Sequence, residues 1–122
     1  MATEKELNEV LEKIQHDANG FIAASLVDLE SGMTLAAKTT RTDFDLTAAS
    51  AYNSELVKQK LKIMATLGIS GSIDDMLISL SDQIHLIKLV GKTSFLYLAV
   101  DKSRSNLAIV RTAVSRHAAG LL

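Results

Sequence analysis

The sequence predicts an α+β sandwich: a five-stranded antiparallel sheet with helices on both faces, in the order α-β-β-α-β-β-β-α. Three observations predict this fold class: very short connections between the last strands, apolar side chains on both faces of those strands, and three segments with helical periodicity. Asp82-Gln83 and Gly91-Lys92 are the connections. They are too short for a parallel crossover, so the last three strands form an antiparallel meander.

The first third of the chain predicts a helix followed by a hairpin. Thr3 and Glu6 form a capping box ahead of an apolar stripe, which indicates a helix over about residues 4–18 that Asn19-Gly20 ends. The segment FIAASLVDL is apolar on both faces and predicts the first strand. ESG is the turn, and MTLAAK, residues 33–38, returns as the second strand.

The two carboxylates at this hairpin need a separate explanation. Asp28 and Glu30 are two residues apart, so on an extended strand both point the same way, as an acid–base pair or a metal site would require. No histidine, arginine or second acidic pair is placed beside them by the sequence. We therefore interpret them as the tip of the hairpin, with Gly32 supplying the positive φ of the turn.

The remaining elements are a long helix, three strands and a last helix. The long helix is predicted from Asp45 or Leu46 to Leu67, with Asp43 or Asp45 as its cap and Gly68 at its C-terminal end. The strands are expected over 73–81, 84–90 and 93–100, and the last helix is expected to begin near residues 103–105. Apolar residues on both faces of these strands require cover on both sides, so we place helix 45–67 on one face and the other two helices on the opposite face. The whole chain, 1–122, is predicted to be a single profilin-like domain.

Composition excludes several classes of function. The 122-residue chain has a formal net charge of −1, no cysteine, no proline and only 4% aromatic residues. Disulfides and thiolate metal sites are therefore absent, and an aromatic stacking platform for nucleic acid is not available. The sequence shows neither an N-terminal apolar leader nor a run of about 18 apolar residues. We expect a cytoplasmic domain that neither inserts into membranes nor binds nucleic acid.

No motif predicts an enzyme, a cofactor or a metal. His16, His85 and His117 lie on three different elements, without another histidine or a ligand-spaced carboxylate beside them. VGKTS, residues 90–94, lacks the earlier glycine of a phosphate-binding loop and leads into a strand, whereas that motif opens a helix. No G-x-S-x-G sequence occurs. Lys102, Arg104, Arg111 and Arg116 give the C-terminal segment only a modest basic face.

The long helix carries the most informative pattern. At 100° per residue its apolar positions cover an arc of about 180°, wider than the stripe of about 100° that one sheet face requires. Asn53 and Lys60 fall near the middle of this arc. One interpretation is an imprecise helix start with a lysine extending along its own stem. We favour the other: one flank packs on the sheet and the other flank packs on a second polypeptide, with Asn53 and Lys60 at the boundary.

The strand 73–81 adds to this interpretation, because it begins the meander and is expected at a sheet edge. Asp74-Asp75 either protects that edge by charge, or the edge pairs with its own copy across a two-fold axis. We predict an isologous homodimer, which light scattering at tens of micromolar would test. The candidate interface residues are Asn53, Leu56, Lys60, Ile63, Met64, Leu67, Ile73, Asp75, Leu77 and Ser79.

The chain resembles the Roadblock / dynein light chain family over nearly its whole length. Three pieces carry the resemblance: Leu7 and Leu11 with Gly20-Phe21, Ala23-Ala24 and Leu26-Val27-Asp28; the long alanine-bearing helix ending at Leu67-Gly68; and Leu98 and Val100 before Asn106-Leu107-Ala108 and Arg111. Asn19-Gly20 stands where the family commonly has proline-glycine.

This resemblance implies a five-stranded sheet between helices and a dimer joined edge to edge through the strand at 73–81, with the long helices alongside. It also implies a scaffold or regulator, typically of a Ras-like small GTPase, and carries no catalytic motif onto this chain. Two alternatives remain: an adaptor of a motor or signalling complex, and a small-molecule sensor. A metabolite that raises the melting temperature would favour the sensor.

Overall fold

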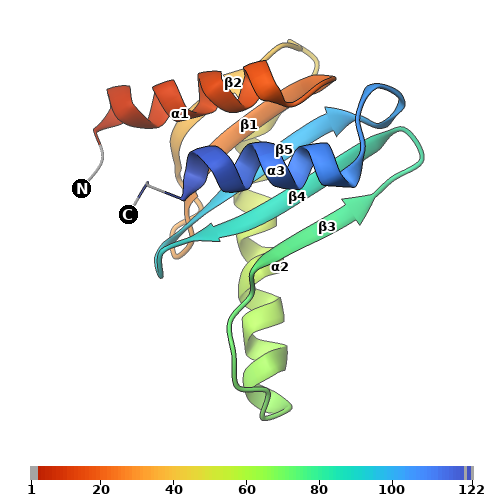
Figure 1. Ribbon diagram of the computed structural model, residues 1–122. Helices are drawn as coiled ribbons and strands as arrows, with labels where there is room; N and C mark the ends of the chain where they lie inside the picture. The colour runs from red at the N-terminus through yellow and green to blue at the C-terminus, as the bar shows by residue number, and fades with distance from the viewer. Residues whose placement is uncertain (1–2, 120, 122) are drawn as a thin grey trace.

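The computed structural model describes residues 3–119 and 121 and confirms the predicted fold class. Five strands form one sheet, and three α-helices pack on its two faces (Figure 1). The elements, in chain order, are α1 (Glu4–Asp17), β1 (Phe21–Asp28), β2 (Thr34–Thr39), α2 (Leu46–Thr66), β3 (Asp75–Ser79), β4 (Gln83–Val90), β5 (Ser94–Asp101), the short 3-10 helix η1 (Lys102–Arg104) and α3 (Leu107–Ala118).

The sheet has the strand order β2-β1-β5-β4-β3, and every pairing is antiparallel. The first and last strands of the chain therefore meet at the centre, where β1 pairs with β5 along most of its length. The outer strands are β2 and β3, which confirms the prediction that the strand beginning the meander lies at an edge. Each edge strand presents one row of backbone groups without a partner strand.

Helices α1 and α3 lie side by side on one face of the sheet, and α2 lies on the other (Figure 1). On the first face Leu11 of α1 and Val114 of α3 pack with Leu26, Leu86 and Leu98, all within 2% of complete burial. On the second face Val57 of α2 packs with strand residues such as Ile87, Phe95 and Tyr97. The apolar residues on both faces of the strands therefore predicted correctly that helices cover both faces of the sheet, with α2 opposite α1 and α3.

Small side chains allow the first half of α2 to pack closely against the sheet. Ser50 and Ser54 are buried on the face of α2 that meets β1. The Ser50 and Ser25 hydroxyls lie 2.8 Å apart, and the Ser54 hydroxyl donates to the Leu29 carbonyl at 2.6 Å. These bonds satisfy the buried polar groups and allow the helix to approach closely. Leu61, one turn beyond Val57, still packs against this core, and the C-terminal end of the helix projects past the strands together with the segment that leads to β3 (Figure 1).

The helix ends are set by the caps that the sequence indicates, with one exception. The Thr3–Glu6 capping box and the Asp45 cap of α2 are both present, and Gly68 follows α2 with a φ of 70°. The expected start of the last helix near residues 103–105 is wrong, because Asp101 caps the 3-10 turn η1 first. Asn106 then caps α3 by accepting from the Ile109 amide at 3.0 Å.

The first hairpin has the predicted turn, and its carboxylates serve that turn. Asp28 accepts from the amide and the hydroxyl of Ser31, at 2.9 and 2.6 Å, and Gly32 has a φ of 77°. These hydrogen bonds hold the pKa of Asp28 below its ordinary value. Such a shift favours the charged form and not the protonated acid that proton transfer to a substrate requires. In the described part of the chain, no helix is long and apolar enough to cross a membrane.

Candidate protein-interaction surface on α2 and β3

A stripe of exposed apolar side chains runs along the outer side of α2. Tyr52, Leu56, Ile63 and Leu67 have exposed fractions of 76%, 39%, 38% and 67%. Their spacing places them on one side of the helix, away from the stripe of Ser50, Ser54 and Val57 that packs on the sheet. We call Tyr52, Leu56, Ile63 and Leu67 the α2 stripe. An apolar stripe of this length on a helix is typical of a surface that contacts another polypeptide.

Two polar residues lie between the buried and exposed sides of α2. Asn53 is half-buried and donates to the Ala49 carbonyl at 2.8 Å. Lys60 is exposed and lies two turns further along the same side. Met64, one turn beyond Lys60, is half-buried. These three residues form the border of the α2 stripe on the side that faces the sheet.

The sheet face beside α2 is only partly covered. Helix α2 packs on β1 and β2, whereas β3 lies at the far edge of the same sheet. The side chains of Met76 and Ile78 on β3 point to this face and are half-buried, and Leu80 just beyond the strand is 39% exposed. The outer backbone groups of β3 have no partner strand among the described residues. The α2 stripe and this part of β3 thus border one open region of the sheet face.

A chain of polar side chains lies on this face between β4, β5 and α2. His85 Nε2 is 2.7 Å from Gln83 Oε1, and His85 Nδ1 is 3.3 Å from the Tyr97 hydroxyl. Burial raises the pKa of Tyr97 to about 12, although a hydrogen bond with Asn53 acts in the opposite direction. Burial also lowers the pKa of His85, an effect that the nearby Asp82 carboxylate opposes. Both shifts favour the neutral form of the side chain.

The structure places the predicted strand residues on the other side of the sheet. Asp75 accepts from Arg111 of α3 at 2.9 and 3.3 Å, and Leu77 packs against the core beneath α1 and α3. Ser79 is exposed, and Ile73 is half-buried just before β3. Asp75 is therefore tied to α3, whereas Asp74 is exposed just before the edge strand. The residues of β3 that share a face with α2 are Met76 and Ile78.

The described residues hold no group of three or more histidine and acidic side chains arranged to bind a metal ion. Two of the histidines nevertheless bond to one carboxylate, that of Asp17. His16 Nδ1 lies 3.1 Å from Asp17, and His117 Nε2 lies 2.5 Å from the same carboxylate. These bonds hold the pKa of Asp17 below its ordinary value. The second contact joins residues 100 positions apart, which spacing in the sequence does not reveal.

Comparison with known proteins gives structural neighbours only. No protein-family model and no curated protein matches the sequence. Among solved structures, Myxococcus xanthus MglB superposes with a TM-score of 0.88 at 16% identity, over 99% of this chain and 88% of that one. The gliding protein MglB from Thermus thermophilus gives 0.83 at 18% identity, over 97% and 87%. A Roadblock/LC7 domain from Streptomyces avermitilis gives 0.82 at 12% identity, over 94% and 93%.

These likenesses extend over almost the whole of each chain, so they concern the complete arrangement of sheet and helices. The chain has the roadblock fold, as the resemblance of its sequence implied. At identities of 12–18% the likeness shows the fold alone.

Proposed function

We propose that this protein is a non-catalytic homodimer that binds a small Ras-like GTPase and modulates its activity or localisation. The observation that carries the proposal is the open region where the α2 stripe meets the uncovered edge of β3. A strand edge and an apolar helix stripe on one face suit the same partner, because one supplies backbone hydrogen bonds and the other supplies buried apolar area.

A second copy fits this region by symmetry. Across a two-fold axis β3 pairs with β3 of the copy, and the α2 stripes of both chains are brought together alongside. Ile63 and Leu56 are 38% and 39% exposed in the single chain, and burial of this remaining area stabilises the dimer by about 1 kcal/mol for each side chain. The hydrogen-bonded side chains of Gln83, His85, Tyr97 and Asn53 lie at the border of the contact, where polar groups fix the register of the two copies.

Two neighbouring exposed residues of α2 give a matched test of self-association. Ile63→Glu places a charge in the α2 stripe, whereas Lys62→Glu places the same side chain about 100° away around the helix. We expect Ile63→Glu to weaken the dimer at least about 100-fold, because a buried unpaired carboxylate adds its desolvation cost to the lost apolar contact. Lys62→Glu should leave the dimer unchanged. Sedimentation velocity over a range of concentrations measures both.

Equal behaviour of the two variants, or a wild-type chain that sediments as a monomer at tens of micromolar, would contradict the dimer. A circular dichroism spectrum of each variant checks that α2 remains folded. Residue 63 is exposed in the single chain, so the substitution itself imposes no packing change on the monomer.

The GTPase part of the proposal rests on the resemblance of the sequence to the Roadblock / dynein light chain family. We assign no catalytic step to this chain, so its effect would come from holding the switch segments of the GTPase in one conformation. The test uses the small GTPase encoded nearest to this protein's gene, loaded with GDP or with a non-hydrolysable GTP analogue. We expect one nucleotide state to bind at least about tenfold more tightly and the rate of GTP hydrolysis to change.

Identical affinity for both states with an unchanged hydrolysis rate would reject GTPase regulation and leave the adaptor role as the remaining candidate. The sensor alternative requires space for a ligand between the sheet and α2. Val57, Phe95 and Tyr97 are buried in that layer and pack together there, which favours a protein partner over a small molecule.

A further inference from the structure

His85 lies in the open region and connects three elements of the fold by hydrogen bonds. Its ring lies edge-to-face against Tyr97 of β5, with 5.4 Å between the ring centroids and 84° between the ring planes. His85 Nε2 is 2.7 Å from Gln83 Oε1, and His85 Nδ1 is 3.3 Å from the Tyr97 hydroxyl. A hydrogen bond between Tyr97 and Asn53 extends the series to α2. We call Gln83, His85, Tyr97 and Asn53 the His85 network.

The hydrogen bonds of the His85 network run in one direction when His85 is neutral. The Gln83 amide oxygen only accepts, so His85 Nε2 carries the proton and Nδ1 accepts from the Tyr97 hydroxyl. The bond with Asn53 lowers the pKa of Tyr97, which identifies Asn53 as its donor. The Asn53 amide also donates to the Ala49 carbonyl at 2.8 Å. Each donor of the neutral network therefore has an acceptor.

A second proton on His85 disrupts this arrangement. Both ring nitrogens then donate, so the Nδ1 proton points at the Tyr97 oxygen and the Tyr97 hydroxyl loses its acceptor. Tyr97 is only 1% exposed, so water does not replace that acceptor. Burial also lowers the pKa of His85 from its ordinary value of 6.5. The charged ring therefore depends on the water that still reaches its exposed side in the single chain.

The charged groups around the ring only partly offset this cost. Asp82, in the turn before β4, favours the charged form of His85, but its effect is smaller than that of burial. Asp101 lies opposite the first residue of β4 and accepts two hydrogen bonds from within η1. Lys60 of α2 and Lys102 of η1 are exposed, and both oppose a further positive charge. β3 presents apolar side chains to this face.

We propose that His85 makes self-association through the open region dependent on pH, so that the dimer forms with the neutral ring and weakens when the ring gains a proton. This inference rests on the homodimer proposed above. A second copy that pairs with β3 and lies along α2 covers the exposed side of the ring and removes the water that solvates its charge. The dimer then binds fewer protons than two separate chains, and acid favours dissociation.

The test measures the dimer dissociation constant of the full-length protein by sedimentation at two pH values and constant salt. Between about pH 7.5 and about pH 5.0 we expect the constant to rise at least about fivefold, because each dissociating dimer takes up protons on two histidine rings. Carboxylates stay ionised over this interval, since their ordinary pKa values lie near about 4.

Two variants test the role of the His85 network. His85→Gln removes the titrating ring and keeps a polar side chain, so its dissociation constant should be nearly the same at both pH values. Tyr97→Phe keeps the packed ring but removes the hydroxyl that protonation leaves without an acceptor. Its pH dependence should be smaller than that of the wild type. Circular dichroism at both pH values checks that each variant is folded.

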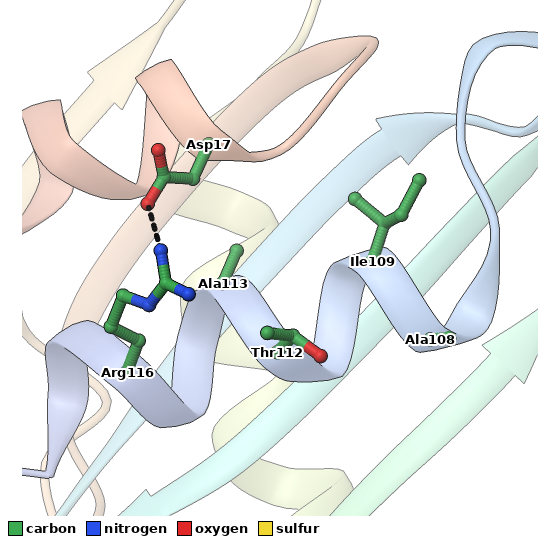
Figure 2. Close-up of a pocket in the computed structure, with 6 residues that line it drawn as sticks. All are labelled: Asp17, Ala108, Ile109, Thr112, Ala113 and Arg116. Atoms are coloured by element: carbon green, nitrogen blue, oxygen red, sulfur yellow. Dashed lines mark ion pairs between the residues drawn. The ribbon is translucent and has the colours of Figure 1, made fainter.

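His16→Gln is the matched control, because it removes a histidine from the opposite face of the sheet. There His16 and His117 both bond to Asp17. Asp17 also pairs with Arg116 at 3.7 Å (Figure 2). The His16 side chain is 89% exposed and is remote from the open region. This variant should keep the pH dependence of the wild type.

A second measurement leaves His85 in place. The pKa of its ring is read from an NMR titration of the wild-type dimer and of the monomeric variant Ile63→Glu. We expect the lower pKa in the dimer, because the coupling between proton binding and self-association is reciprocal. An equal pKa in the two proteins would contradict the proposal.

Equal dissociation constants at both pH values, or a pH dependence that His85→Gln retains in full, would overturn this proposal and leave the dimer itself intact. A wild-type protein that is already monomeric at the higher pH would instead reject the dimer of the proposed function, and the pH dependence with it. The two failures are therefore distinguishable.

Discussion

The two faces of the sheet differ in how completely helices cover them. On one face α1 and α3 lie side by side and enclose the strands, so that Leu98 and Val114 are fully buried. On the other face the single helix α2 packs on β1 and β2, and its C-terminal end projects past the sheet. The closed face therefore holds the fold together, and the open face retains apolar area for a partner.

The difference has a local cause in the sequence of α2. The side of α2 that meets the sheet carries Ser50 and Ser54, which bring the helix close to β1 but bury little apolar area themselves. Larger apolar residues, Ile63 and Leu67, lie on the outer side and further along the helix. The helix is thus attached by its first half, and its second half is available for a contact outside the chain.

Truncation of Leu98 should have the largest effect on stability, because it removes a side chain from the packed core of the closed face. The side chain is fully buried between the sheet and the two helices. We expect Leu98→Ala to lower the free energy of unfolding by about 2–5 kcal/mol, through lost apolar burial and the cavity left behind. Urea denaturation followed by circular dichroism measures the loss.

Ile78→Ala is the matched truncation on the open face. The Ile78 side chain is only half-buried in the single chain, so its removal should cost the monomer about 1 kcal/mol or less. The same change should weaken self-association, since Ile78 is covered only when a partner is present. A loss of monomer stability as large as that of Leu98→Ala would show that the two faces are equally closed, contrary to the comparison.

The closed face was largely predictable from sequence, and the open face was predictable only in part. Alternation along β4 and β5 separated Leu86 and Leu98 from Ile87 and Tyr97, because a strand has only two faces. The wide apolar arc of α2 indicated a second contact. It did not indicate which side of β3 borders that contact, since β3 carries apolar residues on both sides.

Contacts between elements that are distant in the chain could not be predicted from the sequence, for a related reason. Asp17 meets His117 only because α1 and α3 are neighbours on the same face, and no local pattern specifies their relative position. The bond between Arg111 and Asp75 depends in the same way on the position of α3, which packs on β4 next to β3.

We expect a change in pH to have an effect on stability of intermediate size, caused by His85 on the open face. Burial lowers the pKa of His85 from its ordinary value of 6.5, so the native state binds fewer protons than the unfolded state just below that pH. The stability contributed by neutral His85 is therefore present above about pH 6.5 and decreases as the pH falls through it. Urea midpoints at about pH 7.5 and 5.5 would measure the decrease.

His85→Gln removes the titrating group while keeping a polar side chain between Gln83 and Tyr97. We expect this variant to lose less stability than the wild type over the same pH interval. Self-association should show the same trend more strongly, because a second copy covering this face increases the burial of His85. A wild-type dependence that His85→Gln leaves unchanged would assign the effect to other groups.

The smallest effect is expected at the tip of the first hairpin, where Asp28→Asn combined with Glu30→Gln removes both carboxylates. Ser31 donates to Asp28, and this pairing lowers the pKa of Asp28, so its stabilising contribution is lost as the pH falls below the ordinary carboxyl range. Asparagine retains an acceptor for the Ser31 amide, which limits the loss to a small decrease in melting temperature at neutral pH. Self-association and partner binding should be unchanged, because neither carboxylate lies on the α2 stripe. Loss of GTPase binding in a variant that still dimerises would place the partner contact at this hairpin, and would show that the open face of α2 serves self-association alone.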